Sequence, residues 1–236
     1  MIHFVEETGS TNADLLARLR EGERIPEGDW LVARRQSAGR GRQGRQWFDG
    51  SGNFMGSTVV RRSELDPPAH TLALVAGLAV YEAVVSLLPN PSELRLKWPN
   101  DLLYGSAKLS GVLLEAERDA VVIGIGVNLV AAPELPDRQT ISLAEITSPP
   151  PVTTFAETLA GQLDKELERW RSYGLEPLLR RWTAAATPAG TALKVHEPDN
   201  SVIEGEFAGL DDGGNLLLRL ANGAVRAIHA GDVMLA

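Results

Sequence analysis

The chain has 236 residues, of which 44% are hydrophobic and 23% charged, and its formal net charge is −8. This length accommodates one substantial domain and a small second one. The negative charge argues against a nucleic-acid-binding protein, because binding to phosphates depends on Lys and Arg. The absence of cysteine excludes disulfides, thiolate metal sites and cysteine nucleophiles.

The N-terminus shows no basic region followed by an apolar run, so no secretory signal is predicted. The most apolar segment, residues 72–88, is interrupted by Glu82 and predicts a buried helix instead of a membrane span. Together with the lack of cysteine, these features favour a cytoplasmic protein without a membrane partner.

In the first half of the chain, residues 5–10 lead into a helix that Thr11 caps and Gly22 ends. A strand at 30–33 precedes a loop at 34–53 that is rich in Gly and Arg and has no periodicity. A strand at 54–61 and a long helix at 69–88 follow. Three further strands are expected at 93–98, 109–118 and 120–128.

The second half begins with an irregular, Pro-rich stretch at 131–152. Helices are predicted at 153–172 and 175–185. Short alternating runs then occur at 192–196, 201–210, 215–220 and 224–229, separated by hairpin signals. The pattern predicts an α+β domain over residues 1–186 and a small β-barrel over 187–236.

The loop at 34–53 concentrates positive charge in an acidic protein. Its five arginines fall within twelve residues and alternate with glycines. Guanidinium groups fit carboxylate and phosphate oxygens, and glycines let backbone N–H groups approach an anion. The loop therefore indicates a site for an anion with several oxygens, although a solvated basic loop has the same composition. The residues are Arg34, Arg35, Arg40, Arg42 and Arg45, with Gly39, Gly41 and Gly44.

Three shorter motifs lie at expected strand ends. They read KWPND at 97–101, KLSG at 108–111 and GIGVN at 124–128. Pro99 favours a turn that would direct Asn100 and Asp101 into a site. Gly111 inside a strand is typical of close approach by a ligand or another backbone. Each motif alone also fits an ordinary turn, a solvated Lys or a capping Asn.

Together, in this order, the motifs resemble the biotin–protein ligase family. The matching strings are GSTNADLL (9–16), QSAGRGRQGRQW (36–47), KWPNDLL (97–103), KLSGVLLE (108–115) and GIGVNL (124–129). The resemblance implies a mixed β-sheet catalytic domain of the biotin/lipoate ligase type and a C-terminal SH3-like β-barrel. It also implies an enzyme that forms biotinyl-5′-AMP from biotin and ATP and then transfers biotin to a lysine of a biotin carboxyl carrier protein.

The resemblance assigns roles to particular positions. Biotin would be bound by Ser10, Thr11, Asn12, Gln36, Arg40, Gly41, Arg42, Lys108, Gly111, Gly124 and Gly126. ATP would be bound by Arg40, Arg42, Trp47, Asn100, Asp101, Lys108 and Asn128. Lys108, Arg40 and Arg42 would be catalytic, and Asp101 would be a ligand of Mg²⁺. Gly56 and Val130 depart from the family's usual residues at the strand after the loop and after Asn128.

The family context leaves several questions open. Nine residues precede Ser10, so no DNA-binding helix-turn-helix is expected, and no DNA partner. Pairing of sheets makes a homodimer plausible. Two alternatives remain: a lipoate ligase or octanoyltransferase, and a non-catalytic biotin sensor.

Overall fold

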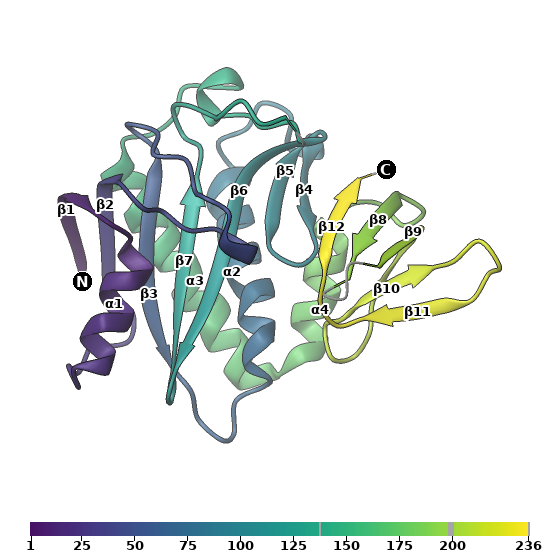
Figure 1. The fold of residues 1–236 in the computed structure, drawn as a ribbon, viewed down its shortest axis with the longest axis horizontal. Helices are drawn as coiled ribbons and strands as arrows, with labels where there is room; N and C mark the ends of the chain where they lie inside the picture. The colour runs from purple at the N-terminus through teal and green to yellow at the C-terminus, as the bar shows by residue number, and fades with distance from the viewer. Residues whose placement is uncertain (137, 198–200, 236) are drawn as a thin grey trace.

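The structure, a computed structural model, describes residues 1–136, 138–197 and 201–235. A seven-stranded mixed sheet forms the body of the molecule, in the order β1-β2-β3-β7-β6-β5-β4 (Figure 1). Only β1 and β2 pair in parallel, and the other neighbours are antiparallel. The strands are β1 Ile2–Thr8, β2 Trp30–Gln36, β3 Phe54–Arg61, β4 Leu94–Lys97, β5 Asp101–Tyr104, β6 Ala107–Glu117 and β7 Ala120–Val127.

Helices cover the two faces of this sheet unequally. Helix α1, Thr11–Arg20, lies on one face, and α2, Leu72–Val85, lies on the other with α3, Val152–Tyr173, behind it (Figure 1). Helix α4, Leu175–Ala185, packs beside α2 and α3. Strand β7 serves both faces, since successive side chains alternate. Its odd-numbered residues 121–127 join the core under α2 and α3, whereas Ala120 and Val122 pack with the leucines of α1.

A second, antiparallel sheet of five strands follows in the order β11-β10-β9-β8-β12. We call it the C-terminal sheet. Its strands are β8 Ala192–His196, β9 Val202–Leu210, β10 Leu216–Arg219, β11 Val225–Ile228 and β12 Asp232–Leu235. The predicted α+β fold with a small C-terminal β domain is confirmed. The proposed boundary between residues 186 and 187 stays a prediction.

Several predicted details are wrong. Ser10, not Thr11, is the N-cap of α1: it has extended dihedral angles and its side chain accepts a hydrogen bond from the N–H of Ala13. Strand β2 runs on to Gln36, inside the predicted loop. Strands β1, β5 and β12 were not predicted. All three are short or lie at a sheet edge, so their sequences carry little alternation.

No helix in the described ranges has both the length and the apolar run needed to cross a bilayer. The apolar segment around α2 is instead buried between the large sheet and α3. Its prediction as a core helix is confirmed.

One buried carboxylate connects the three helices of the core face. Glu166 of α3 is 1% exposed and forms ion pairs with Arg169, at 2.7 Å, and with Arg181 of α4. Arg181 also lies 2.9 Å from Glu82 of α2. Because a buried charge needs compensation, these contacts fix how the helices sit against one another.

We expect Glu166→Ala to lower the free energy of unfolding by about 2–3 kcal/mol, because it removes the charged hydrogen bonds that this buried carboxylate accepts from Arg169 and Arg181. Urea denaturation at neutral pH measures the loss. Glu168→Ala, at an exposed position of the same helix, is the control and should leave the midpoint unchanged. Equal midpoints for the two variants would contradict the role of Glu166.

Candidate active site

A cavity of about 730 Å³ opens on the α1 face of the large sheet. It is lined by segments from both sheets, which are far apart in the sequence. Every residue that the sequence assigned to the site lies on its wall. These are Ser10, Thr11, Asn12, Gln36, Arg40, Gly41, Arg42, Trp47, Asn100, Asp101, Lys108, Gly111, Gly124, Gly126 and Asn128.

The floor of the cavity is set by strand register. Met55, Gly126, Gly111 and Asp101 are direct cross-strand partners on β3, β7, β6 and β5, and Lys97 on β4 pairs with Asp101. Partners in an antiparallel sheet place their side chains on the same face. The two adjacent glycines therefore leave a strip without side chains between Met55 and Asp101, and this strip is the cavity floor.

One end of the cavity is lined by uncharged, hydrogen-bonded side chains. The backbone N–H of Thr11 donates to Oε1 of Gln36 at 2.8 Å. Ser57 Oγ donates to Asn12 Oδ1 at 2.6 Å, and Asn12 Nδ2 donates to Glu115 Oε2 at 2.9 Å. These bonds fix the orientation of the Asn12 amide. The first turn of α1 thus presents donors and acceptors in a defined geometry.

Ser57 and Glu115 were missed by the sequence analysis. Ser57 is fully buried on β3, and its hydroxyl also lies 2.6 Å from Thr11 Oγ1. The only sequence signal was a polar residue inside an apolar strand. Its contact with α1 depends on packing between segments 46 residues apart, which local patterns do not encode.

The other end of the cavity is cationic and is organised by one carboxylate. Lys108 Nζ lies 2.5 Å from Asp101 Oδ1, and Lys97 Nζ lies 3.0 Å from Oδ2. Burial alone would raise the pKa of Asp101, but Lys108 and Lys97 outweigh it and hold the pKa well below its usual range. Asp101 is therefore ionised at neutral pH and holds two ammonium groups side by side.

A covering loop, residues 37–53 between β2 and β3, lies over the cavity. It closes on itself through a bridge between Arg40 and Gln46. Arg42 donates to Asn100 Oδ1 at 3.0 Å, and Asn100 Nδ2 donates to the carbonyl of Val112 at 2.7 Å. Asn100 therefore connects the loop to the floor strand β6.

Most of the five arginines at 34–45 have partners within the protein. Three have acidic partners, and Arg42 has oxygen acceptors. The ion pairs are Arg34 with Glu6, Arg35 with Asp49, and Arg45 with Asp232. Arg40 is exposed and forms no ion pair with the residues that the structure describes. The positive charges of β2 and the covering loop therefore each have a partner in the described part of the protein, except that of Arg40.

Trp47 packs against the floor. A Cβ added to Gly126 would stand 2.2 Å from its ring, so only glycine permits this contact. Four buried side-chain atoms of the described residues have no hydrogen-bond partner: Trp30 Nε1, Trp47 Nε1, Asp101 Oδ1 and Asn128 Oδ1. Of these, Asp101 Oδ1 faces the ammonium group of Lys108, and Trp47 and Asn128 lie on the cavity wall. The amide nitrogen of Asn128 is used, since it donates to the carbonyl of Ile141 at 3.2 Å. Buried polar atoms without partners mark where a ligand can bond, and Asn128 offers an acceptor there.

Gly56, where the chain departs from the family pattern, also lines the cavity, and its lack of a side chain makes room for Phe54. Gly56 pairs with Ile125, which faces the core. A Cβ at position 56 would stand 2.7 Å from the ring of Phe54. Phe54 therefore fills the space that a larger residue at position 56 would need.

Asp101 does not have the surroundings of the predicted magnesium ligand. The described residues include no cluster of three His, Cys, Asp or Glu side chains that could hold a metal. Both oxygens of Asp101, the predicted ligand, face ammonium groups. Mg²⁺ prefers free carboxylates together with substrate phosphates. The arrangement does not fit Asp101 as a magnesium ligand, and no chemical step is assigned to the metal.

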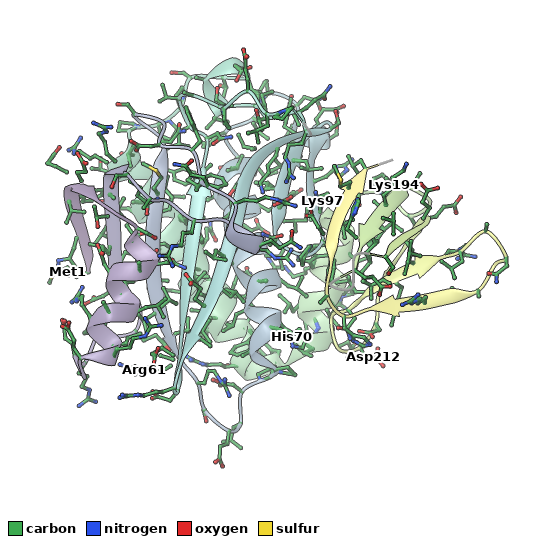
Figure 2. All side chains as sticks on the ribbon, in the orientation of Figure 1. Met1, Arg61, His70, Lys97, Lys194 and Asp212 are labelled. Atoms are coloured by element: carbon green, nitrogen blue, oxygen red, sulfur yellow. The ribbon has the colours of Figure 1, made fainter. Side chains whose placement is uncertain are left out.

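The low pKa of Asp101 predicts a pH effect on stability. A depressed pKa contributes stability above the unfolded value of about 3.9, and this is lost as the pH falls towards the folded pKa. Asp101→Asn should therefore show a shallower loss of unfolding free energy than the unmutated protein below about pH 5. Urea titrations at a series of pH values measure the slopes. Asp212→Asn, in an exposed turn labelled in Figure 2, is the control. Parallel curves for Asp101→Asn and the unmutated protein would refute the ion-pair assignment.

Comparison with known proteins gives a consistent result over the whole chain. Residues 5–128 match the Biotin/lipoate A/B protein ligase family, and residues 193–235 match the biotin protein ligase C-terminal domain. The Biotin–[acetyl-CoA-carboxylase] ligase of Mycobacterium tuberculosis (strain ATCC 25618 / H37Rv) is 37% identical, over 99% of this chain and 88% of the relative. The ligase of the same name from Paracoccus denitrificans is 35% identical, over 90% and 91%.

Among solved structures, the biotin protein ligase from Aquifex aeolicus in complex with biotin and ATP has a TM-score of 0.88 and 26% identity. The match covers 100% of this chain and 99% of that one. The two family matches cover both the large sheet and the C-terminal sheet, and the chain belongs to the biotin/lipoate A/B protein ligase family.

Proposed function

We propose that this chain is an ATP-dependent biotin–protein ligase. It forms biotinyl-5′-AMP from biotin and ATP, and then transfers biotin to a lysine of a biotin carboxyl carrier protein. One observation carries this assignment: a single cavity joins a neutral, hydrogen-bonded end to a cationic end across a glycine floor. Biotin has the matching shape, with a urea at one end and a carboxylate at the other.

The neutral end distinguishes biotin from lipoate. A urea both donates and accepts hydrogen bonds, as do the side chains of Ser10, Asn12 and Gln36. The dithiolane of lipoate does neither. A lipoyl group in this end would leave buried polar atoms unpaired, which is costly. The alternative of a lipoate ligase or octanoyltransferase is therefore disfavoured by the geometry as well as by the names of the relatives.

The cationic end serves the first chemical step. A carboxylate oxygen of biotin attacks the α-phosphorus of ATP, an acyl–phosphate bond forms, and the bond to pyrophosphate breaks with pyrophosphate taking the electron pair. Both reactants are anionic, so fixed positive charge lowers the barrier. Lys108 supplies it at a position set by Asp101, and Arg40 and Arg42 supply it from the covering loop.

The second step is attack by a neutral carrier lysine on the acyl carbon, with AMP as the leaving group. The amine nitrogen then loses a proton to water, and the bond between the acyl carbon and the phosphate oxygen breaks with AMP taking the electron pair. Asp101 is a weak proton acceptor because its pKa is held low by two lysines. Its role is to orient Lys108 and Lys97. Trp47 and Asn128 lie where the nucleotide would bind, and the unpaired Oδ1 of Asn128 is suited to an exocyclic amine.

The partner is a biotin carrier of the kind that the relatives' names indicate, a subunit of acetyl-CoA carboxylase. We place this chain in the cytoplasm, together with the carrier that it modifies. Pairing into a homodimer through sheet edges stays a prediction, and no contact with DNA or membrane is part of the proposal.

Lys108→Ala tests the cationic end. The variant should adenylate biotin more slowly by roughly 10²–10³-fold, because it loses one charge that stabilises the transition state. Biotin-dependent exchange of labelled pyrophosphate into ATP measures this step alone. Lys194→Ala, in an exposed ion pair of the C-terminal sheet, is the control. Unchanged exchange in Lys108→Ala would sink the assignment, and no exchange by the unmutated protein would favour a biotin sensor.

Arg42→Gly tests retention of the intermediate. The change removes the loop's bonds to Asn100 and to the carbonyl of Gly231, while Lys108 remains for adenylation. Biotinyl-5′-AMP should form and then escape, since such losses usually appear in the dissociation rate. Streptavidin blots of albumin added to the reaction should show biotin on this bystander. Arg24→Gly, at an exposed position, should not do so. Carrier-only labelling by Arg42→Gly would argue against a retaining role.

A further inference from the structure

Gly231 and the first two residues of β12 contact three cationic side chains of the candidate active site. We call residues 231–233 the latch segment. The carbonyl of Gly231 accepts a hydrogen bond from Arg42 at 3.1 Å, and the carboxylate of Asp232 pairs with Arg45. The carbonyl of Val233 accepts from Lys97 Nζ at 2.7 Å. Arg42 and Arg45 belong to the covering loop, and Lys97 is the last residue of β4, beside the cavity floor.

The latch segment is also fixed by its contacts with β8 of the C-terminal sheet. Strand β12 pairs with β8, with Asp232 opposite His196. A Cβ at Gly231 would stand 2.9 Å from Val195 and 3.0 Å from the carbonyl of His196. The chain therefore enters β12 at a distance that only glycine permits, and this fixes where the carboxylate of Asp232 points.

The C-terminal sheet is also fixed to the catalytic part at a second place. Trp98 Nε1 donates to the carbonyl of Gly214 at 3.0 Å, and His70 Nε2 lies 2.9 Å from the carbonyl of Gly213. Figure 2 shows Lys97 beside β12, and His70 near the turn that holds Asp212. With two separate attachments the sheet cannot swing freely, so the latch segment is a fixed point for the loop.

Asp232 carries a full negative charge at this point. Its side chain is 16% exposed. Burial would raise the pKa of Asp232, but Arg45, Arg138 and Lys97 outweigh it and hold the pKa below the usual range. The carboxylate lines the same cavity as Lys108 and Asp101. It was not among the residues that sequence reasoning singled out.

We propose that Asp232 is a positioning residue of this enzyme, which holds Arg45 and thereby keeps the covering loop closed over the acyl-adenylate. The inference rests on the proposed function. A partly exposed ion pair contributes little to global stability. The closed fraction of a loop, in contrast, changes several-fold with a contact of the same strength. The C-terminal sheet therefore acts on retention of the intermediate, through Arg45, and not on bond making.

The first test is Asp232→Asn. The protein is loaded with labelled biotin and ATP, and release of labelled biotinyl-5′-AMP is followed after a chase with unlabelled biotin. Release should be roughly fivefold faster than from the unmutated protein, the size expected for loss of one partly exposed ion pair. The single-turnover rate of adenylate formation and the melting temperature should stay unchanged. Glu204→Gln, which removes the exposed Lys194–Glu204 pair of the same sheet, should change none of the three.

A double-mutant cycle identifies the partner. Arg45→Gln should also speed release, and adding Asp232→Asn to it should have no further effect. Asp232→Glu keeps the charge and should release at a rate between those of the unmutated protein and Asp232→Asn. Wild-type release from Asp232→Asn, or effects of the two changes that multiply fully, would overturn the proposal. An unmutated protein that forms no adenylate would instead refute the proposed function, so the two failures are distinguishable.

Discussion

The central strands of the large sheet need small residues on the face that forms the cavity and large apolar residues on the face that packs against the core helices. Strand β7 meets both demands through the pattern Gly-Ile-Gly-Val at 124–127. Ile125 and Val127 are buried in the core with α2 and α3, whereas Gly124 and Gly126 face α1 and the cavity. A Cβ at Gly124 would stand 2.2 Å from Asn12 Oδ1. The same absence of side chains thus lets the first turn of α1 and the ring of Trp47 reach the sheet.

A cationic end beside an apolar core needs an internal counter-charge. Asp101 provides it, because it sits next to the bare strip in register and neutralises one of two flanking lysines. Without this carboxylate, Lys97 and Lys108 would repel each other in a region of low dielectric. With it, the pair retains a net positive charge at a fixed place. The site is thereby preorganised for an anion.

The sequence predicted which motif residues converge at the site, but not the individual contacts between them and the rest of the chain. Lys108, Asn100 and Gly126 occur in motifs whose order resembles a known family, so their convergence could be expected. The contacts of Ser57 and Asp232 could not be predicted. The contact of Ser57 depends on how α1 packs on β3. The contact of Asp232 depends on an ion pair with Arg45, which is 187 residues away in the chain. The β1 strand was missed since an edge strand with one parallel neighbour shows little alternation.

The composition of the covering loop determines how it can close. Residues 40, 43, 45 and 48 are exposed, and Trp47 packs its ring against the glycine floor. Besides this ring, the loop is held by a small number of polar contacts from Arg42 and Arg45 to Asn100 and to the latch segment. Such contacts are individually weak and screened by salt. A loop held in this way keeps a reactive anhydride from water and free amines, yet opens readily. Both properties are required, because the same cavity has to admit a lysine of the carrier once the adenylate has formed.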